Sequence, residues 1–297
     1  MTRSGRSVRG VGKGRWIAGV IVGAVLLAAS YVLAVWTRDG QAIENAALRG
    51  ADQISEQELI AANDALNAIT IGSLAAAVVL IAVIALVRRR VDLAIAGVGT
   101  VVLGQLITQS LKRFILPRPG LVEVTGDFVH NSFPSGHTTI AMTVLFALIL
   151  VLPYRWRGLT IFLVWGWAIS IGAFTITAKW HRLSDTIGAM GVALLCASLA
   201  SWWLASRGRV ARNTGRAFPG RVVLVVLIAL ASVGTVVTGA SIWVMGGLRG
   251  IDFAVRDDIW EYNAYLGANT VAAGAAGLVL LLFWALWHRL EAVPRRT

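Results

Sequence analysis

Residues 133–152 read FPSGHTTIAMTVLFALILVL, a polar turn ending in His137 that leads directly into an apolar run. The run itself, Thr138–Leu152, contains no charged side chain. Seven similar runs occur elsewhere, at Trp16–Trp36, Ala68–Val87, Val91–Leu111, Leu159–Ala178, Thr186–Ala205, Val222–Met245 and Asn269–Trp287. Runs of about 20 apolar residues are typical of membrane-spanning helices, because lipid offers the backbone no other hydrogen-bond partners. The sequence therefore predicts an all-α, polytopic transmembrane helix bundle with about eight spans.

The composition supports a membrane protein. Of the 297 residues, 57% are hydrophobic and only 14% are charged, with a mean hydropathy of +0.73. The net charge of +12 is also typical of nucleic-acid binding. The basic residues, however, gather in short loops between the apolar runs, which indicates membrane topology instead. We therefore expect membrane lipids, and no nucleic acid, as partners; the oligomeric state is left open. One cysteine, Cys196, allows no internal disulfide.

The loops alternate in charge along the chain. Eighteen of the 27 basic residues fall on one side of the predicted bundle: Arg3, Arg6, Arg9, Lys13, Arg15, Arg88, Arg89, Arg90, Arg155, Arg157, Arg207, Arg209, Arg212, Arg216, Arg221, Arg289, Arg295 and Arg296. The positive-inside rule makes this side, with both termini, cytoplasmic. Nearly all acids fall on the other side. The compact loops favour a bacterial inner membrane. The outer segment 41–67 has a helical pattern and is either an amphipathic cap on the membrane or a soluble linker.

Five cations break this rule and lie on the predicted outer face: Lys112, Arg113, Arg118, Lys179 and Arg182. They accompany two histidine clusters, Phe133–His137 and His181–Asp185. Ionisable groups near a bilayer are costly and usually functional. Five positive charges beside two histidines predict a bound anion. The alternative for Lys112 and Arg118 is snorkelling at a helix end.

Ser135-Gly136-His137 opens the fourth span. Glycine lets a ligand approach the backbone, and N–H groups at a helix start attract anions. His137 is placed to donate a proton to a departing alkoxide. A simple helix cap with an incidental histidine is the alternative.

His181 and Asp185 are one helical turn apart. A carboxylate bonded to one imidazole nitrogen fixes the tautomer and leaves the other nitrogen free to attack. Asp185 or Ser184 is also a suitable helix cap, and the two roles are compatible.

The ordered set Lys112…Arg118-Pro119, Pro134-Ser135-Gly136-His137 and His181…Asp185 resembles the type-2 phosphatidic acid phosphatase family, in its bacterial integral-membrane branch. The resemblance implies that Lys112, Arg118, Ser135 and Gly136 bind phosphate. It further implies that His181 attacks phosphorus to form a phosphohistidine, that Asp185 orients His181, and that His137 protonates the leaving oxygen. No metal and no cofactor is expected.

Two positions depart from the family pattern. Five residues separate Lys112 from Arg118, where the family usually has six. The arginine that the family places six residues before the histidine is Thr175 here. Lys179 and Arg182 are the candidates to replace its charge.

The resemblance predicts a metal-independent membrane phosphatase for a lipid phosphate or diphosphate, such as undecaprenyl diphosphate, phosphatidic acid or phosphatidylglycerol phosphate. The alternatives are a phosphotransferase with an alcohol acceptor and a non-catalytic lipid-binding or transport protein. The expected organisation is a basic cytoplasmic N-terminus (1–15), a six-span core with an outer-face active site (16–205), a basic cytoplasmic loop (206–221), and two additional spans with a tail (222–297).

Overall fold

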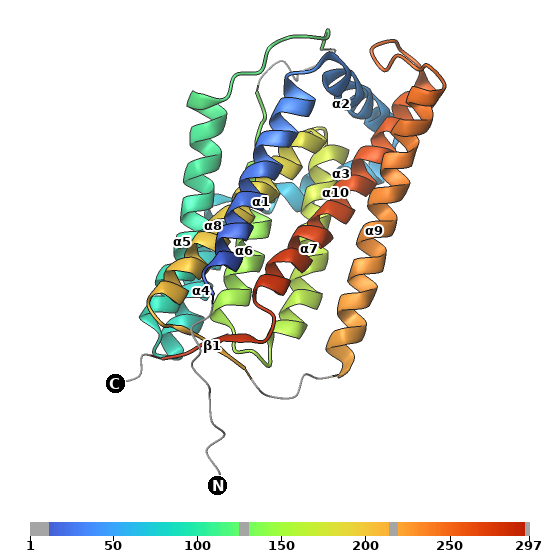
Figure 1. Ribbon diagram of the computed structural model, residues 1–297. Coiled ribbons are helices and arrows are strands. Elements are labelled where there is room, and N and C mark those ends of the chain that lie inside the picture. Colours follow the sequence, from blue (N-terminus) through green and yellow to red (C-terminus); the bar gives the residue numbers. More distant parts are fainter. Residues whose placement is uncertain (1–11, 125–130, 214–218, 295–297) are drawn as a thin grey trace.

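The computed structural model describes residues 12–124, 131–213 and 219–294. These residues form ten α-helices and two short strands: α1 (Gly14–Ser30), α2 (Arg38–Gly50), α3 (Glu56–Asn67), α4 (Ile71–Val87), α5 (Val91–Ser110), α6 (Gly136–Val151), α7 (Arg157–Thr177), α8 (Leu183–Ser206), β1 (Val210–Arg212), α9 (Pro219–Leu248), α10 (Asp258–Leu286) and β2 (Leu290–Ala292). A π-helical turn, η1 (Tyr31–Val35), extends α1, another, η3 (Leu111–Ile115), extends α5, and a 3-10 turn, η2 (Ala51–Gln53), follows α2. The prediction of an all-α polytopic bundle is confirmed (Figure 1).

A helix occupies each of the eight predicted apolar runs. Within the described residues, five helical segments are long and apolar enough to cross a membrane: Gly14–Val35, Val91–Ile115, Leu183–Ser206, Val222–Leu248 and Asp258–Leu286. The pair α3 and α4 also passes as one span with a bend of 57°. The two other apolar helices, Gly136–Val151 and Ile161–Thr177, are shorter. The chain is therefore a multi-pass membrane protein.

The short helix α6 lies at the centre of the bundle, and α5, α7 and α8 pack around it. Its side chains Met142, Leu145 and Phe146 are fully buried. Because the neighbouring helices cover α6, most of its side chains contact protein and not lipid. Helix α6 is therefore a buried core helix of the bundle. Helix α8 in turn packs closely on α1, where a Cβ at Gly23 would lie 2.7 Å from the carbonyl oxygen of Gly191. Small residues at such crossings let membrane helices approach closely.

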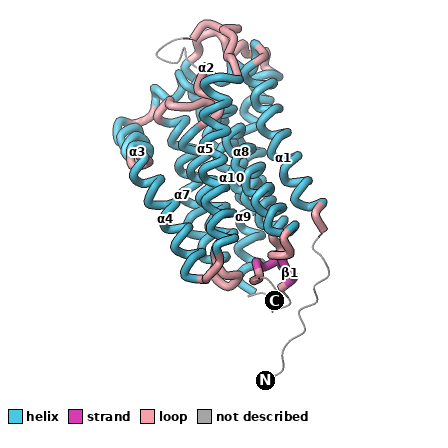
Figure 2. Tube along the Cα trace, turned by 90° about the vertical axis from the view of Figure 1, so that its left-hand side faces the viewer, coloured by secondary structure: helices cyan, strands magenta, loops and turns pink. Residues whose placement is uncertain are grey.

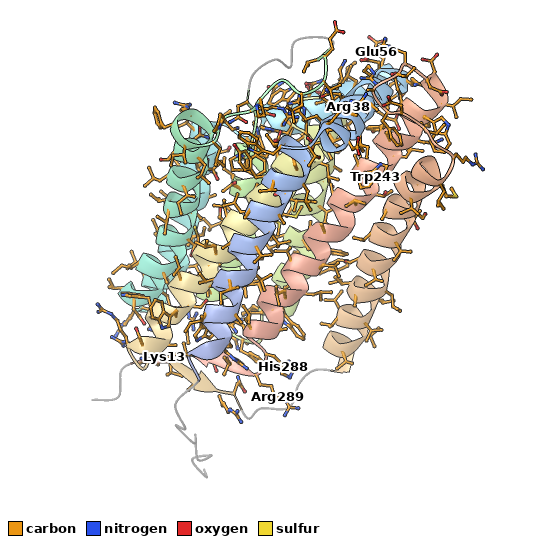
Figure 3. All side chains as sticks on the ribbon, turned by 45° about the horizontal axis from the view of Figure 1, so that its top comes forward. Lys13, Arg38, Glu56, Trp243, His288 and Arg289 are labelled. Carbon is orange, nitrogen blue, oxygen red and sulfur yellow. The ribbon has the colours of Figure 1, made fainter. Side chains whose placement is uncertain are left out.

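The two ends of the bundle differ. Strands β1 and β2 pair antiparallel at one end, where Arg90 donates to the carbonyl of Ala292 and Arg157 to that of Leu290. Lys13, His288 and Arg289 also lie there, whereas Arg38 and Glu56 lie at the other end (Figure 3). The α2 end carries the motif residues at the starts of α6 and α8. The basic loop residues named above thus lie at one end of the bundle, and the histidine motifs lie at the other.

The first half of segment 41–67, helix α2, differs from both interpretations made from its sequence, whereas α3 buries only Ala62 and Leu66. Helix α2 packs on α10, and α3 packs on α7 (Figures 1 and 2). Nine of the thirteen residues of α2 are buried, including the polar side chains Gln41, Glu44 and Asn45. A membrane-surface helix or a linker would expose these groups. Helix α2 is instead part of the folded core and covers the motif end of the bundle.

Candidate active site

His181 and Asp185 form the centre of the site. Asp185 lies in the first turn of α8 and is fully buried, and the His181 ring is 8% exposed. The His181 Nδ1 atom lies 3.3 Å from Asp185 Oδ2. The same oxygen accepts hydrogen bonds from the backbone N–H of Arg182 at 2.9 Å and from the Ser132 hydroxyl at 2.5 Å. One carboxylate therefore both caps α8 and orients the imidazole, which unites the two roles considered for it.

The environment of His181 favours the neutral imidazole. Burial lowers the pKa of His181, while the hydrogen bond and negative charge of Asp185 oppose this shift. The charge of Lys112 adds to the lowering of this pKa. An imidazole that is neutral and held through Nδ1 leaves Nε2 with a free lone pair, the state required of a nucleophile.

Ser135, Gly136 and His137 begin α6 beside this pair. The Ser135 hydroxyl accepts a hydrogen bond from Thr138 N at 3.3 Å, so the expected helix cap is present. The Ser135 N–H donates to the backbone carbonyl of Asp185 at 2.9 Å, which joins the two motif loops. The His137 ring lies 6.2 Å from the His181 ring and 5.2 Å from the Trp180 ring, measured between centroids. His137 lies in the first turn of α6 and His181 in the turn before α8, so two separate segments bring their imidazole rings close together.

Phe133 fixes the loop that carries Ser132. The peptide bond between Phe133 and Pro134 is cis, and the Phe133 side chain is fully buried. Its ring lies against α8 at Gly188, where an added Cβ would lie 2.5 Å from the ring. Glycine at this position is therefore a packing requirement, because only a missing side chain leaves room for the ring.

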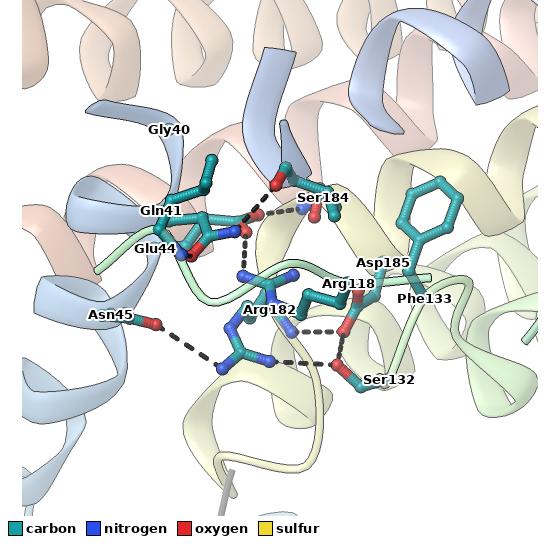
Figure 4. Close-up of polar contacts among 12 residues, drawn as sticks. Gly40, Gln41, Glu44, Asn45, Arg118, Ser132, Phe133, Arg182, Ser184 and Asp185 are labelled. Atoms are coloured by element: carbon teal, nitrogen blue, oxygen red, sulfur yellow. Dashed lines mark hydrogen bonds and ion pairs between the residues drawn. The ribbon is translucent and has the colours of Figure 1, made fainter. Parts of the chain in front are cut away.

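Arg182 belongs to the site. It is 2% exposed, and its Nη1 donates to the Ser132 hydroxyl at 3.2 Å while its Nη2 donates to Asn45 Oδ1 at 3.5 Å (Figure 4). Through Ser132 the guanidinium connects to Asp185 and so to His181. Thr175, where the family usually has arginine, is buried beneath this loop, and its carbonyl accepts the His181 N–H at 3.0 Å. Arg182 thus brings a cation to the centre of the site from another backbone position.

The other candidate to replace that charge, Lys179, lies apart. It has a positive φ of 59° and forms an ion pair with Asp52, whose side chain is 62% exposed. No contact of Lys179 with His137, His181 or Asp185 is present in the described part of the chain. The structure therefore does not bring Lys179 into the cluster.

Lys112 lies in the π-helical turn η3 at the end of α5. Its carbonyl accepts a hydrogen bond from the Asn131 amide at 3.2 Å, which ties the turn to the loop before Ser132. The Lys112 charge acts on both His137 and His181. The positive charge of Lys112 thus influences both histidines, although the spacing to Arg118 is one residue shorter than the family pattern.

Arg118 is held by a carboxylate from α2. Its Nη2 lies 3.4 Å from Glu44 Oε2, and Glu44 Oε1 accepts the backbone N–H of Ser184 at 2.8 Å (Figure 4). The Nη1 atom of Arg118 is buried with no hydrogen-bond partner. Burial raises the pKa of Glu44, and the negative charge of Asp185 adds to this, while Arg118 opposes it. A carboxylate on an arginine and a helix N-terminus occupies the kind of position that a phosphate oxygen favours.

Sequence reasoning missed Glu44, Asn45, Gln41 and Ser132. Gln41 is buried and donates to the carbonyls of Val35 and Pro119, so it links η1 to the Arg118 loop. The sequence feature that could have revealed the residues of α2 is the polar spacing i, i+3 and i+4 of Gln41, Glu44 and Asn45. Three alanines and one glycine of the same helix are also buried. Polar groups with such spacing face one side of a helix, and here that side is the site.

Among the residues that the structure describes, no three His, Cys, Asp or Glu side chains gather in a way suited to a metal ion. The cluster instead combines two histidines, one orienting carboxylate, and the cations Lys112, Arg118 and Arg182. Such a set can bind an anionic group and carry out nucleophilic and acid–base chemistry on it.

Comparison with known proteins agrees with this chemistry. No curated protein and no solved structure gives a match. Residues 92–209 match the sequence model of the PAP2 superfamily. The matched stretch runs from the start of α5 to just beyond α8 and contains all three motifs, while α1–α4, α9 and α10 lie outside it. The match covers these central helices, about two fifths of the chain; it supports membership of the type-2 phosphatidic acid phosphatase family and indicates a phosphatase of lipid phosphates in general.

Proposed function

We propose that this protein hydrolyses a lipid phosphate or diphosphate through a phosphohistidine intermediate, without a metal ion, at the outer face of a bacterial inner membrane. The observation that carries the proposal is the buried His181–Asp185 pair, in which His181 Nδ1 lies 3.3 Å from the carboxylate. The charge pattern supports cytoplasmic termini, since the basic loops lie at the end of the bundle opposite the site.

The first step transfers the phosphoryl group to the protein. The cations Lys112, Arg118 and Arg182, with Ser135 and the Gly136 N–H, neutralise the phosphate oxygens. The His181 Nε2 lone pair forms a bond to phosphorus, and the bond from phosphorus to the lipid oxygen breaks. His137 gives its proton to that oxygen, so the lipid alcohol, or the lipid monophosphate from a diphosphate, leaves neutral at the broken bond.

The second step releases phosphate. Water attacks the phosphohistidine, His137 takes a proton from it, and His181 regains its lone pair as the phosphorus–nitrogen bond breaks. Positioning and charge stabilisation provide most of the rate in phosphoryl transfer, and the buried cations supply both. Asp185 stabilises the positive charge that the His181 ring gains.

The proposal assigns this chemistry to the six-span core, residues 16–205. Residues 1–15 and 206–221 are the basic cytoplasmic segments, and residues 222–297 are an extension of two spans and a tail. Substrates that fit are an isoprenoid diphosphate such as undecaprenyl diphosphate, phosphatidic acid and phosphatidylglycerol phosphate, since each keeps its apolar part in the membrane and presents phosphate at its surface.

The test is phosphate release in detergent, with EDTA present, from undecaprenyl diphosphate and from phosphatidic acid. We expect release by the native protein and a loss of about 1,000-fold or more for His181→Ala, as for removal of a covalent nucleophile. His288→Ala is the matched control, because His288 lies at the other end of the bundle against Trp284. Release that EDTA abolishes would overturn the metal-free mechanism. A folded native protein that releases no phosphate from either lipid would favour a transferase or a lipid-binding protein.

A further inference from the structure

An apolar pocket of about 300 Å³ lies beside the site, at the α2 end of the bundle. Its walls come from the end of α1 with η1, from α2 and α8, and from α7, α9 and α10. The apolar lining includes Leu33, Ile43, Ala47, Ile187, Trp243 and Ala268. Pockets of ~300–1,000 Å³ with mostly apolar linings and few polar groups are typical small-molecule sites.

Three polar residues of the candidate site belong to the lining of this pocket. Arg182, Ser184 and Glu44 line it. Arg182 follows the proposed nucleophile directly in the chain and connects to Asp185 through Ser132. The Ser184 hydroxyl is buried and has no hydrogen-bond partner, and the Ser184 N–H is held by Glu44. The pocket therefore joins an apolar space to one buried cation, Arg182, and to the Ser184 hydroxyl, beside the Glu44 carboxyl group.

Two other hollows do not offer this combination. One is apolar and is lined by residues of α5 and α8 that include Ile95, Cys196 and Trp203. It begins at least twelve residues along α8 from Ser184, about 18 Å at helical rise. The other lies between α2 and the loop after α9, next to the charged Arg38 and Asp252. Neither contains a residue of the two histidine motifs.

The pocket also reaches the lipid-facing surface. Leu33 lines it and is 66% exposed, on a segment that is apolar enough to span the membrane. Trp243 belongs to α9, whose apolar side chains are largely exposed on the outside of the bundle (Figure 3). A hydrocarbon chain can therefore pass from the bilayer into the pocket without crossing water.

We propose that this pocket binds the hydrocarbon chain of the lipid phosphate while its phosphate lies at the Arg182 end. The inference rests on the proposed function and gives a role to α2, α9 and α10, which lie outside the family match. A hydrocarbon chain with an anionic head matches an apolar pocket whose lining includes the buried Arg182, and Leu33 continues the pocket wall to the lipid-facing surface.

The test compares two alkyl phosphates with the same leaving chemistry, butyl phosphate and hexadecyl phosphate. Ala34→Phe places a ring in the pocket from the α1 wall, and Ala268→Leu narrows it from α10. Val25→Phe is the matched control, since Val25 is on the same helix as the α1 wall and is 56% exposed outside the pocket. We expect both pocket variants to lower kcat/KM for hexadecyl phosphate about tenfold relative to butyl phosphate, the effect of displacing about two methylene groups from apolar burial. Val25→Phe should leave the ratio unchanged.

A binding measurement separates this inference from the proposed function. Hexadecyl phosphate should raise the thermal unfolding midpoint of the native protein and of Val25→Phe, but not of Ala34→Phe or Ala268→Leu. Inorganic phosphate should act equally on all four. If the native protein hydrolyses neither ester, the proposed function fails, and this midpoint pattern still decides the pocket. The pocket does not hold the chain if both pocket variants keep the native kcat/KM for hexadecyl phosphate. It also does not hold the chain if kcat/KM falls equally for the two esters.

Discussion

The helices matched to the PAP2 superfamily and the helices that flank them contribute different parts of one site. The matched helices α5–α8 supply His137, His181, Asp185 and Arg182, which carry the proposed chemistry. The flanking helix α2 supplies Glu44 and further polar contacts, and α1, α9 and α10 supply apolar pocket walls. In the proposed mechanism the matched region carries the reaction, and the flanking helices supply residues around the proposed phosphate and chain sites.

The two regions also differ in how their charges are compensated. In the matched region one buried carboxylate, Asp185, is hydrogen bonded on one oxygen by three different groups. In α2, Glu44 is a buried anion that offsets Arg118 and approaches Arg182. A bound phosphate would compete with Glu44 for the same arginines. We therefore expect Glu44 to stabilise the site without phosphate and to weaken phosphate binding.

The largest expected effect is the loss of folding stability caused by the substitution Glu44→Gln. Removing one partner of a buried ion pair destabilises a protein by about 3–5 kcal/mol, because the remaining charge is left buried and unpaired. Inorganic phosphate should restore much of the loss, since its charge replaces that of Glu44 beside Arg118. The measurement is the thermal unfolding midpoint with and without phosphate.

Glu261→Gln is the matched control for Glu44→Gln. Glu261 forms a buried pair with Arg49 at 2.5 Å, also between α2 and another helix, but away from the histidine motifs. We expect a similar loss of stability that phosphate does not restore. Equal rescue of both variants, or of neither, would contradict the idea that Glu44 holds the place of a phosphate.

The next effect distinguishes the two cations that were candidates to replace the family arginine. Arg182→Gln should lower kcat/KM by about 10–100-fold, the range for losing a hydrogen bond to a charged group in a buried site. Lys179→Gln should change it less than about threefold, because an exposed ion pair such as that with Asp52 contributes little. Steady-state kinetics on one lipid phosphate checks both. A larger effect at Lys179 than at Arg182 would reverse the assignment.

A smaller effect is expected where the two motif loops pack together. Gly188→Ala should destabilise the protein by about 1–3 kcal/mol and lower kcat, because the added methyl group displaces Phe133 and with it the Ser132 loop. Gly99→Ala is the control, since a Cβ at this position on α5 meets nothing within 4 Å. The Gly99→Ala variant should therefore keep the native free energy of unfolding. If Gly188→Ala keeps native kcat, the Phe133 ring does not position Ser132.

The sequence predicted the bundle well because apolar runs and charged loops report directly on lipid and water. It also predicted the residues that lie together, since His137, His181 and Asp185 carry a motif whose spacing fixes them at helix starts. It did not predict the place of α2. A helix with mixed polar and small residues looks similar whether its polar stripe faces water or a buried cluster, and only the arginines across the interface decide which.

The two replacement candidates show the same limit. Lys179 and Arg182 are three residues apart and have the same charge, so periodicity gives no preference between them. The conformation of the turn after α7 determines which of the two cations enters the site. Lys179 adopts a positive φ and pairs with Asp52, whereas Arg182 lies just before α8 and is buried. Backbone conformation in a short turn depends on tertiary contacts that no local pattern records.

The smallest effect expected is a shift in pH dependence, and its sign tests the electrostatics within the matched region. Burial lowers the pKa of His181, so the acid limb of kcat/KM should have its midpoint below the ordinary histidine value of about 6.5. Below that midpoint the ring is protonated, and the rate should fall about tenfold per pH unit because the nucleophilic lone pair is lost.

Two substitutions should move this midpoint in opposite directions. The Asp185 carboxylate stabilises the protonated ring, so Asp185→Asn removes that support and moves the limb to lower pH, even as the rate itself falls. The Lys112 charge disfavours the protonated ring, so Lys112→Gln moves the limb to higher pH. The expected result is the sign of each shift, downward in pH for Asp185→Asn and upward for Lys112→Gln. Profiles of kcat/KM against pH for the two variants give the answer, and shifts in the same direction would mean that the limb reports a group other than His181.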